Sequence, residues 1–208
     1  SRVAADVVTK SSLITACDRA GLWAQALTAL REMPSASLQP NVLSYGAALA
    51  GCESHGLWRQ ALQLLEDARD QAQKLDLVLY NIVIGVCGKS GEWVQAFALL
   101  RQLRSDTIRP DTITLSAVVG ACASASQWLK ALEVIARMPK QKINPDDVTC
   151  GAAVRACEAA GRWAHAVHAL DGMRGRYLRP GLATESALLG SLKKGGRWQR
   201  ALQNLAGL

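Results

Sequence analysis

Apolar residues recur along this chain at the spacing of short amphipathic helices, which are separated by polar turns. In the middle of the chain, Tyr80, Val83, Ile84 and Cys87 follow the order i, i+3, i+4, i+7. This order places the four side chains on one face of a helix. The pattern therefore predicts a helix over roughly residues 78–89.

A second apolar stretch begins just after Gly91, a residue suited to ending the first helix. Its members again follow helical spacing: Trp93, Ala96, Phe97, Leu100 and Leu103. We expect a second helix over roughly residues 92–104. A polar turn then leads to Pro110, which stops a helix, and to Asp111, which can cap the next one.

This pair of stretches repeats along the whole chain with an interval of 35 residues and no insertion or deletion. Tryptophan keeps the interval at Trp23, Trp58, Trp93, Trp128, Trp163 and Trp198. Cysteine keeps it at Cys17, Cys52, Cys87, Cys122 and Cys157. Helices this short are unstable alone in water, so each pair must bury its apolar face against the next pair. The sequence predicts an all-α fold, an α-solenoid of stacked antiparallel helix pairs.

The repeat boundary falls just after the residue that follows the recurring proline. The repeats are then residues 7–41, 42–76, 77–111, 112–146 and 147–181, with a partial repeat over 182–208. Residues 1–6 form a leader or the end of a preceding repeat, because Asp6 occupies the last slot of a repeat.

The periodic cysteines are expected to be small buried side chains. Packed helices lie about 8–10 Å apart, whereas a disulfide requires Cα atoms within about 7 Å. No CxxC pair is present, so we expect no metal site. The three histidines are His55, His165 and His168, and the last two have no acidic or cysteine partner fixed by spacing. With no glycine-rich phosphate loop either, the sequence favours a protein that is not an enzyme and uses no cofactor or small-molecule substrate.

Charge points to an acidic partner. The chain has 24 Lys and Arg against 17 Asp and Glu, a net charge of +7. The last three repeats carry +2, +2 and +3. Such an excess can bind a phosphate backbone, or can be an ordinary solvated surface. The apolar stretches are too short to span a membrane.

The 35-residue helix pair, with Asn or Asp at its end, resembles the pentatricopeptide repeat family. The repeat that begins Leu-Val-Leu-Tyr-Asn at Leu77 and ends Arg-Pro-Asp at Asp111 carries the resemblance most clearly. The resemblance implies a P-type array in a right-handed superhelix that binds single-stranded RNA, about one base per repeat. The Trp- and Cys-rich composition is similar to that of some algal arrays.

By this resemblance, the fifth and the last residue of each repeat select the base. Ser11 with Asn41 resembles an adenine-preferring pair, Asn81 with Asp111 a uracil-preferring pair, and Ser116 with Asp146 a guanine-preferring pair. The glycines of two repeats, Gly46 and Gly151, offer no side chain to a base, and Ser186 lies in the partial repeat. The implied target is A-any-U-G-any.

The family also implies an aliphatic clamp at the second residue and a cation late in the first helix. The clamp slot holds Val8, Leu43, Val78, Ile113 and Val148, with Ala183 in the partial repeat. Ordinary packing near a helix start explains such residues equally well. The cation slot, expected to contact phosphate, holds Arg19, Lys89 and Lys194.

Two functions remain open on these grounds. The first is a sequence-selective RNA-binding adaptor in organellar RNA processing, stability or translation, in a chloroplast rather than a mitochondrion by family resemblance. The second is a protein-binding scaffold, a structural subunit of an organellar ribosome or of a photosynthetic or respiratory complex. Long solenoid surfaces suit protein partners as well as RNA.

Overall fold

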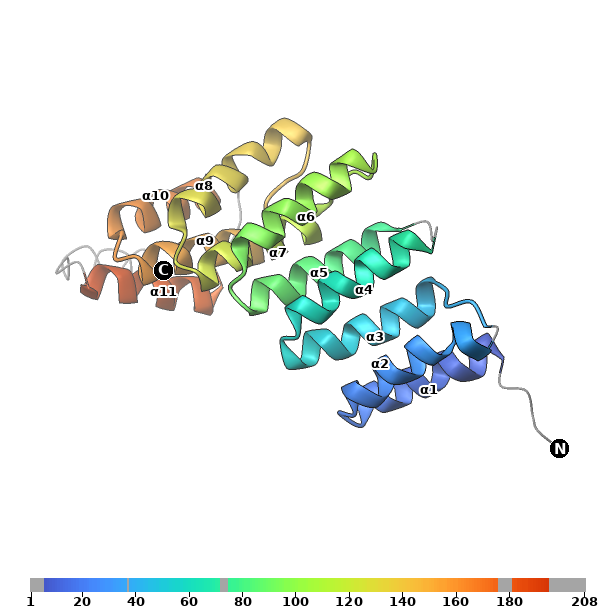
Figure 1. Ribbon diagram of the computed structural model, residues 1–208. Coiled ribbons are helices and arrows are strands. Elements are labelled where there is room, and N and C mark those ends of the chain that lie inside the picture. Colours follow the sequence, from blue (N-terminus) through green and yellow to red (C-terminus); the bar gives the residue numbers. More distant parts are fainter. Residues whose placement is uncertain (1–5, 37, 72–74, 176–180, 195–208) are drawn as a thin grey trace.

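A computed structural model describes residues 6–36, 38–71, 75–175 and 181–194 of the chain. These residues form eleven α-helices stacked in chain order, with α1 and α11 at opposite ends of the array (Figure 1). The helices are α1 (Val7–Arg19), α2 (Trp23–Glu32), α3 (Val42–His55), α4 (Trp58–Asp70), α5 (Leu77–Lys89), α6 (Trp93–Ser105), α7 (Thr112–Ser124), α8 (Trp128–Arg137), α9 (Asp147–Ala159), α10 (Trp163–Arg174) and α11 (Leu182–Lys194). The described residues form no strand, so the expected α-solenoid is confirmed.

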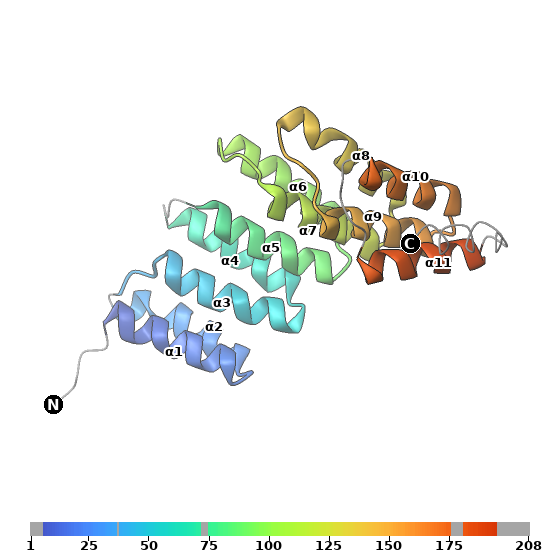
Figure 2. The same cartoon turned by 180° about the vertical axis from the view of Figure 1, so that it is seen from behind.

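The helices form two layers of unequal spacing. Consecutive odd-numbered helices, α1 through α11, pack directly against one another, and each even-numbered helix packs between two of them (Figure 2). Within the described ranges, consecutive even-numbered helices do not pack closely against one another. Because the odd-numbered layer is more closely spaced, the array curves toward it. We call it the inner layer, and the even-numbered helices the outer layer.

One glycine shows how closely the inner helices approach. A Cβ atom at Gly88 of α5 would lie 3.2 Å from the backbone oxygen of Ala117 in α7. That distance is tighter than almost all real Cβ contacts, so the missing side chain permits the approach.

Five of the six inner helices in the described residues begin where an Asp or Asn side chain caps them, whereas α11 follows Gly181. Asp111 Oδ1 accepts a hydrogen bond from the backbone N–H of Thr114 at 2.8 Å, as the sequence predicted. The same bond is made at the starts of four other inner helices by Asp6, Asn41, Asp76 and Asp146. Each cap satisfies a backbone N–H that the helix itself leaves without a partner.

The first helix of a pair ends where the backbone turns into the left-handed region. Gly21, Gly56, Gly91 and Gly161 have φ between 65° and 73° there. In the fourth repeat the same slot is taken by Ser126, with φ of 56°. Serine tolerates this conformation less well than glycine, so this turn is locally strained.

Two outer helices are shorter than the others, which the sequence analysis did not anticipate. Helices α2 and α8 have 10 residues each, whereas α4 and α6 have 13. Each short helix leads into a 3₁₀ turn that begins at Pro34 or Pro139. Proline lacks the backbone N–H that the next helical turn would need.

The periodic small residues lie in the core. Cys52, Cys87, Cys122 and Cys157 are buried, and Cys17 is half-buried. Burial raises the pKa of the Cys52, Cys87 and Cys122 thiols to about 11, so they stay protonated at neutral pH. The tryptophans of the described helices are half-buried and pack against the core: Trp23, Trp58, Trp93, Trp128 and Trp163. None of the helices in the described segments is long and apolar enough to cross a bilayer.

Candidate nucleic-acid interface

A row of exposed aliphatic side chains runs along the inner layer. The residues at the second position of each inner helix are between 61% and 74% exposed: Val8, Leu43, Val78, Ile113 and Val148. They therefore do not pack in the core, and ordinary burial near a helix start does not explain them. Large apolar side chains that recur in register on one surface indicate a binding surface. The side chain of Ala183, in the same slot, lies outside the described residues.

The fifth residues of the repeats lie one helical turn beyond this row. Ser11, Asn81 and Ser116 are half-buried, and Ser186 is exposed. Over the first two repeats and the start of the third, aliphatic and polar side chains line a groove of about 630 Å³. Val8, Leu43 and Val78 stand beside Ser11, Asn41, Gly46 and Asp76 there. Apolar walls with a few polar groups are the arrangement that holds a flat ligand such as a nucleobase.

The last residue of a repeat lies beside the fifth residue and also caps a helix. Asn81 Nδ2 donates to Asp111 Oδ1 at 3.4 Å, and Ser116 Oγ lies 3.5 Å from Asp146 Oδ1. Burial acts to raise the pKa of the Asp111 carboxyl, but hydrogen bonds from Thr114 and Asn81 outweigh it and hold this pKa below its usual value. Asp111 is therefore ionised at neutral pH and acts only as an acceptor.

A hydroxyl that was not predicted from the sequence joins these two positions. Thr114, the third residue of its helix, donates through Oγ1 to Asn81 Oδ1 at 2.6 Å and lies 2.8 Å from Asp111 Oδ1. Ser44 and Thr149 occupy the corresponding place in two other repeats. The signal was present in the sequence, because Thr9, Ser44, Thr114, Thr149 and Thr184 keep the 35-residue interval and Leu79 breaks it.

The three residues expected to contact phosphate differ in their surroundings. Arg19 is exposed, whereas Lys89 Nζ forms an ion pair with Glu53 Oε1 across two repeats at 3.0 Å. The side chain of Lys194 lies outside the described residues.

A second inner groove contains a cation that the sequence analysis did not single out. Arg155 and Lys89 both line this groove, which has a volume of about 490 Å³. The remaining lining residues are small: Gly85, Gly88, Ala117, Gly120, Ala123, Ser124 and Ala159. Two cations in a groove lined by small residues can bind a sugar–phosphate backbone.

In the described part of the chain, no three His, Cys, Asp or Glu side chains are grouped so that they could hold a metal ion. His165 is exposed and lies against Trp128 of the preceding repeat, with ring centroids 4.5 Å apart. Its surroundings are those of a packing residue.

Solved structures share this architecture. The pentatricopeptide repeat protein PPR10 in complex with an 18-nt psaJ RNA element is 26% identical, with a TM-score of 0.81. The match covers 98% of this chain and 29% of that one. PPR10 from maize, at 20% identity and a TM-score of 0.61, matches over 92% of this chain and 32% of that one.

A related enzyme component has the same fold. The PPR domain of Arabidopsis thaliana protein-only RNase P 1, solved in complex with tRNA, is 20% identical with a TM-score of 0.67. The match covers 77% of this chain and 84% of that domain. No curated protein sequence matches the chain.

The family model for the pentacotripeptide-repeat region of PRORP matches residues 45–206, which is well over half of the chain. Together with the 35-residue helix pairs and the inner row of aliphatic and polar side chains, this match shows that the chain belongs to the pentatricopeptide repeat family.

Proposed function

We propose that this chain binds single-stranded RNA along its inner layer and selects bases with the fifth and last residues of its repeats. The observation that carries the proposal is the row of five exposed aliphatic side chains beside half-buried polar ones. Aliphatic side chains from neighbouring repeats can hold a base by its two faces, while a polar side chain reaches its edge. The likeness to PPR10, solved with an RNA element, supports the proposal.

The selected sequence is A-any-U-G-any, from the N-terminal repeat toward the C-terminal one. Ser11 with Asn41, Asn81 with Asp111 and Ser116 with Asp146 select the three bases. The repeats with Gly46 and Gly151 accept any base, because they offer no side chain to a base edge.

The proposed biological role requires RNA binding and no catalytic step. A chain that holds RNA extended in a groove acts as an adaptor rather than an enzyme, by blocking nucleases, opening a hairpin or recruiting a partner. An organellar setting, in RNA processing, stability or translation and in the chloroplast, is part of this proposal and rests on the family resemblance.

The test is the affinity for a short C-rich RNA that contains A-C-U-G-C and for versions with one base changed. We expect a change of the U or of the G to weaken binding about fivefold, the effect of roughly one hydrogen bond. Asn81→Ala should remove the preference at U and keep the preference at G. Equal affinity for a scrambled RNA would refute base selection.

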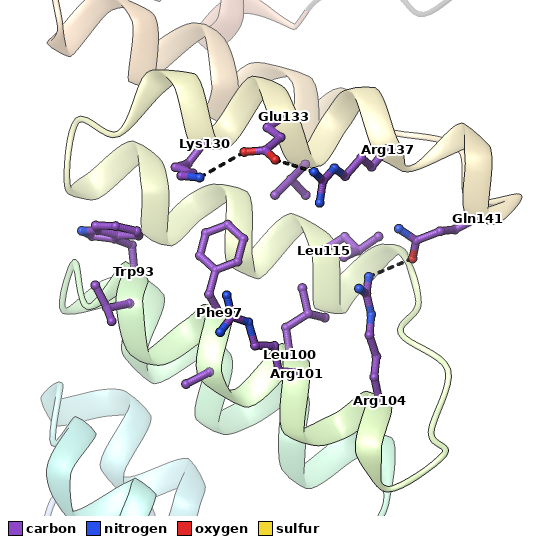
Figure 3. A pocket seen from close by; sticks show the side chains of 13 residues that line it. Trp93, Phe97, Leu100, Arg101, Arg104, Leu115, Lys130, Glu133, Arg137 and Gln141 are labelled. Atoms are coloured by element: carbon purple, nitrogen blue, oxygen red, sulfur yellow. Dashed lines mark hydrogen bonds and ion pairs between the residues drawn. The ribbon is translucent and has the colours of Figure 1, made fainter.

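A cavity in the outer layer favours a second function, binding of a protein segment. It has a volume of about 380 Å³ and lies between α6 and α8, on the layer away from the RNA groove (Figure 3). Its apolar lining includes Phe97, Leu100, Leu115 and Val134.

The rim of this cavity is basic. Arg101, Arg104, Lys130 and Arg137 surround a single acid, Glu133, which pairs with Lys130 at 3.2 Å and with Arg137 at 2.6 Å (Figure 3). Arg101 makes no hydrogen bond or ion pair with the described residues. An apolar cavity with an excess of cations suits an acidic segment with an apolar anchor.

A labelled peptide with Leu and Glu at helical spacing tests this second function, and a version with Lys in place of Glu is its control. Binding of the acidic peptide should be lost in Arg101→Glu and kept in Arg59→Glu, which changes the same charge on α4. RNA affinity should respond similarly to both variants. Failure of the acidic peptide to bind the unmodified chain would rule this function out.

A further inference from the structure

The third residue of the inner helices is a buried hydroxyl in most repeats. Ser44, Thr114, Thr149 and Thr184 are at most 3% exposed. A buried hydroxyl is costly unless it is hydrogen-bonded, so its partners indicate what it does. In three repeats those partners are the two side chains that the proposed function assigns to base selection.

The third repeat shows the arrangement most fully. The Thr114 hydroxyl donates to Asn81 Oδ1 at 2.6 Å, and Asn81 Nδ2 donates to Asp111 Oδ1 at 3.4 Å. Asp111 also accepts from the backbone N–H of Thr114 at 2.8 Å, so the capped helix fixes the position of the carboxylate. The Thr114 donor therefore faces the amide oxygen of Asn81, and the Asp111 acceptor faces its amide nitrogen. These two bonds hold the Asn81 amide in one orientation.

This orientation matters because an amide has two hydrogen-bonding halves. After these two bonds, Asn81 still has one N–H and one oxygen lone pair to offer to a ligand. Uracil presents an N3–H donor beside a carbonyl acceptor, whereas cytosine presents an N3 acceptor beside an amino donor. An amide group that can rotate by 180° could pair with either base. An amide group held in one orientation pairs with only one of them.

We propose that Thr114 is a positioning residue for base selection, which holds the Asn81 amide in the orientation that distinguishes uracil from cytosine. This inference rests on the proposed function, because it assigns a cause to the selectivity of that same site. The third residue of a repeat therefore contributes to the selectivity of the repeat before it.

The first and fourth repeats contain the same connection with a serine. Ser11 Oγ donates to the Val7 carbonyl at 2.7 Å and lies 2.8 Å from Ser44 Oγ. Because the Ser11 proton is taken, Ser44 Oγ is the donor to Ser11 Oγ, and Ser44 Oγ also lies 3.0 Å from Asn41 Oδ1. Because the proton of Ser11 is engaged by a backbone oxygen, Ser11 offers an acceptor to the groove.

In the fourth repeat, Ser116 Oγ is hydrogen-bonded to Thr149 Oγ1, and Thr149 Oγ1 donates to Asp146 Oδ1 at 2.6 Å. The hydroxyl of the third residue again lies between the fifth residue and the last one.

The second repeat is informative because it lacks both partners. Its fifth residue is Gly46, and the third residue of the next helix is Leu79 instead of a hydroxyl. Asp76 is nevertheless present and caps α5 through the N–H of Leu79 at 2.9 Å. A Cβ atom at Gly46 would meet only Leu79 Cδ2, at 3.8 Å, so a side chain fits there. Two substitutions would recreate the arrangement of the third repeat.

The loss experiment measures the ratio of affinities for U and C at the base that faces the third repeat. Thr114→Val removes the hydroxyl at nearly constant shape, and we expect the ratio to fall about fivefold. Thr114→Ser keeps the hydroxyl and should keep the ratio. Thr149→Val should leave this ratio unchanged and instead weaken the preference for G at the next base. Helical content by circular dichroism confirms that each variant is folded.

The gain experiment builds the arrangement where it is absent. We expect Gly46→Asn with Leu79→Thr to create a preference for U over C at the second base, and Gly46→Asn alone to create a clearly smaller one. Leu79→Thr alone should create none.

The outcomes separate the two proposals. If the unmodified chain shows no preference at the third and fourth repeats, base selection itself is wrong. If it prefers U and G but Thr114→Val keeps the full U-to-C ratio, base selection stands and the positioning role of Thr114 is wrong. If Gly46→Asn creates the same preference for U over C with and without Leu79→Thr, the positioning role of the third residue is also wrong.

Discussion

At the scale of single residues, the last side chain of a repeat serves two purposes. Asp111 stabilises the start of α7 through the N–H of Thr114 and also lies beside Asn81 in the groove. Asp76 caps α5 in the same way, but it faces Gly46, which has no side chain to position. Substitution of a last residue that is Asp or Asn therefore changes stability wherever it caps the next helix, and changes base selection only where the fifth residue can reach a base.

This difference predicts a contrast between two alanine variants. Asp76→Ala and Asp111→Ala should each lower the free energy of unfolding by about 1 kcal/mol, since each removes one helix cap. Only Asp111→Ala should also lose preference for U over C. Urea denaturation and binding to single-base RNA variants measure the two effects. A loss of base preference in Asp76→Ala would show that capping and base selection are not separable.

At the scale of elements, the sequence predicted the helices closely because three residue types mark their ends. The helices expected over residues 78–89 and 92–104 are α5 (Leu77–Lys89) and α6 (Trp93–Ser105). Trp opens the outer helix, a residue with positive φ ends the inner one, and a capping carboxylate starts the next. The early ends of α2 and α8 were missed, although Pro34 and Pro139 occupy matching slots.

Less of the candidate site could be predicted, because a periodic pattern does not report what a side chain touches. Exposure of the aliphatic row required the packed structure, since the same residues would suit a buried helix start. The pairing of Lys89 with Glu53 joins two repeats and follows from no spacing rule. The hydroxyl of Thr114 is periodic, but only its distances to Asn81 and Asp111 indicate a role.

The turn at Ser126 gives a prediction about helix termination. Ser126→Gly should raise the free energy of unfolding by roughly 0.5–1 kcal/mol, because glycine adopts positive φ without steric cost. Gly161→Ser, at the same slot of the fifth repeat with φ of 66°, should lower it by a similar amount. Thermal unfolding of both variants measures these effects. The two changes in the free energy of unfolding must have opposite signs. An increase from both substitutions would contradict the explanation by positive φ.

At the scale of the whole molecule, the two layers present different surfaces to different partners. The inner layer is closely packed and contains the aliphatic row and the groove lined by Lys89 and Arg155. The outer layer is more widely spaced and contains the basic cavity of Figure 3. Basic residues therefore line a cavity on each layer, and only the charges on the inner one should contribute to RNA affinity.

A pair of matched substitutions tests that division. Glu53→Gln and Glu133→Gln each remove one negative charge and each release a cation, Lys89 in the inner groove or Lys130 and Arg137 at the outer cavity. A released Lys89 can contact one further phosphate, which should steepen the dependence of log K on log salt by about 0.7 and strengthen RNA binding at low salt.

Glu133→Gln should leave that slope unchanged, because its cations face away from the groove. Since Lys89 and Glu53 are both solvent-exposed, their ion pair is weak, and the gain in RNA affinity should be no more than a few fold. Equal gains from both variants would mean that RNA responds to total charge and not to the inner surface.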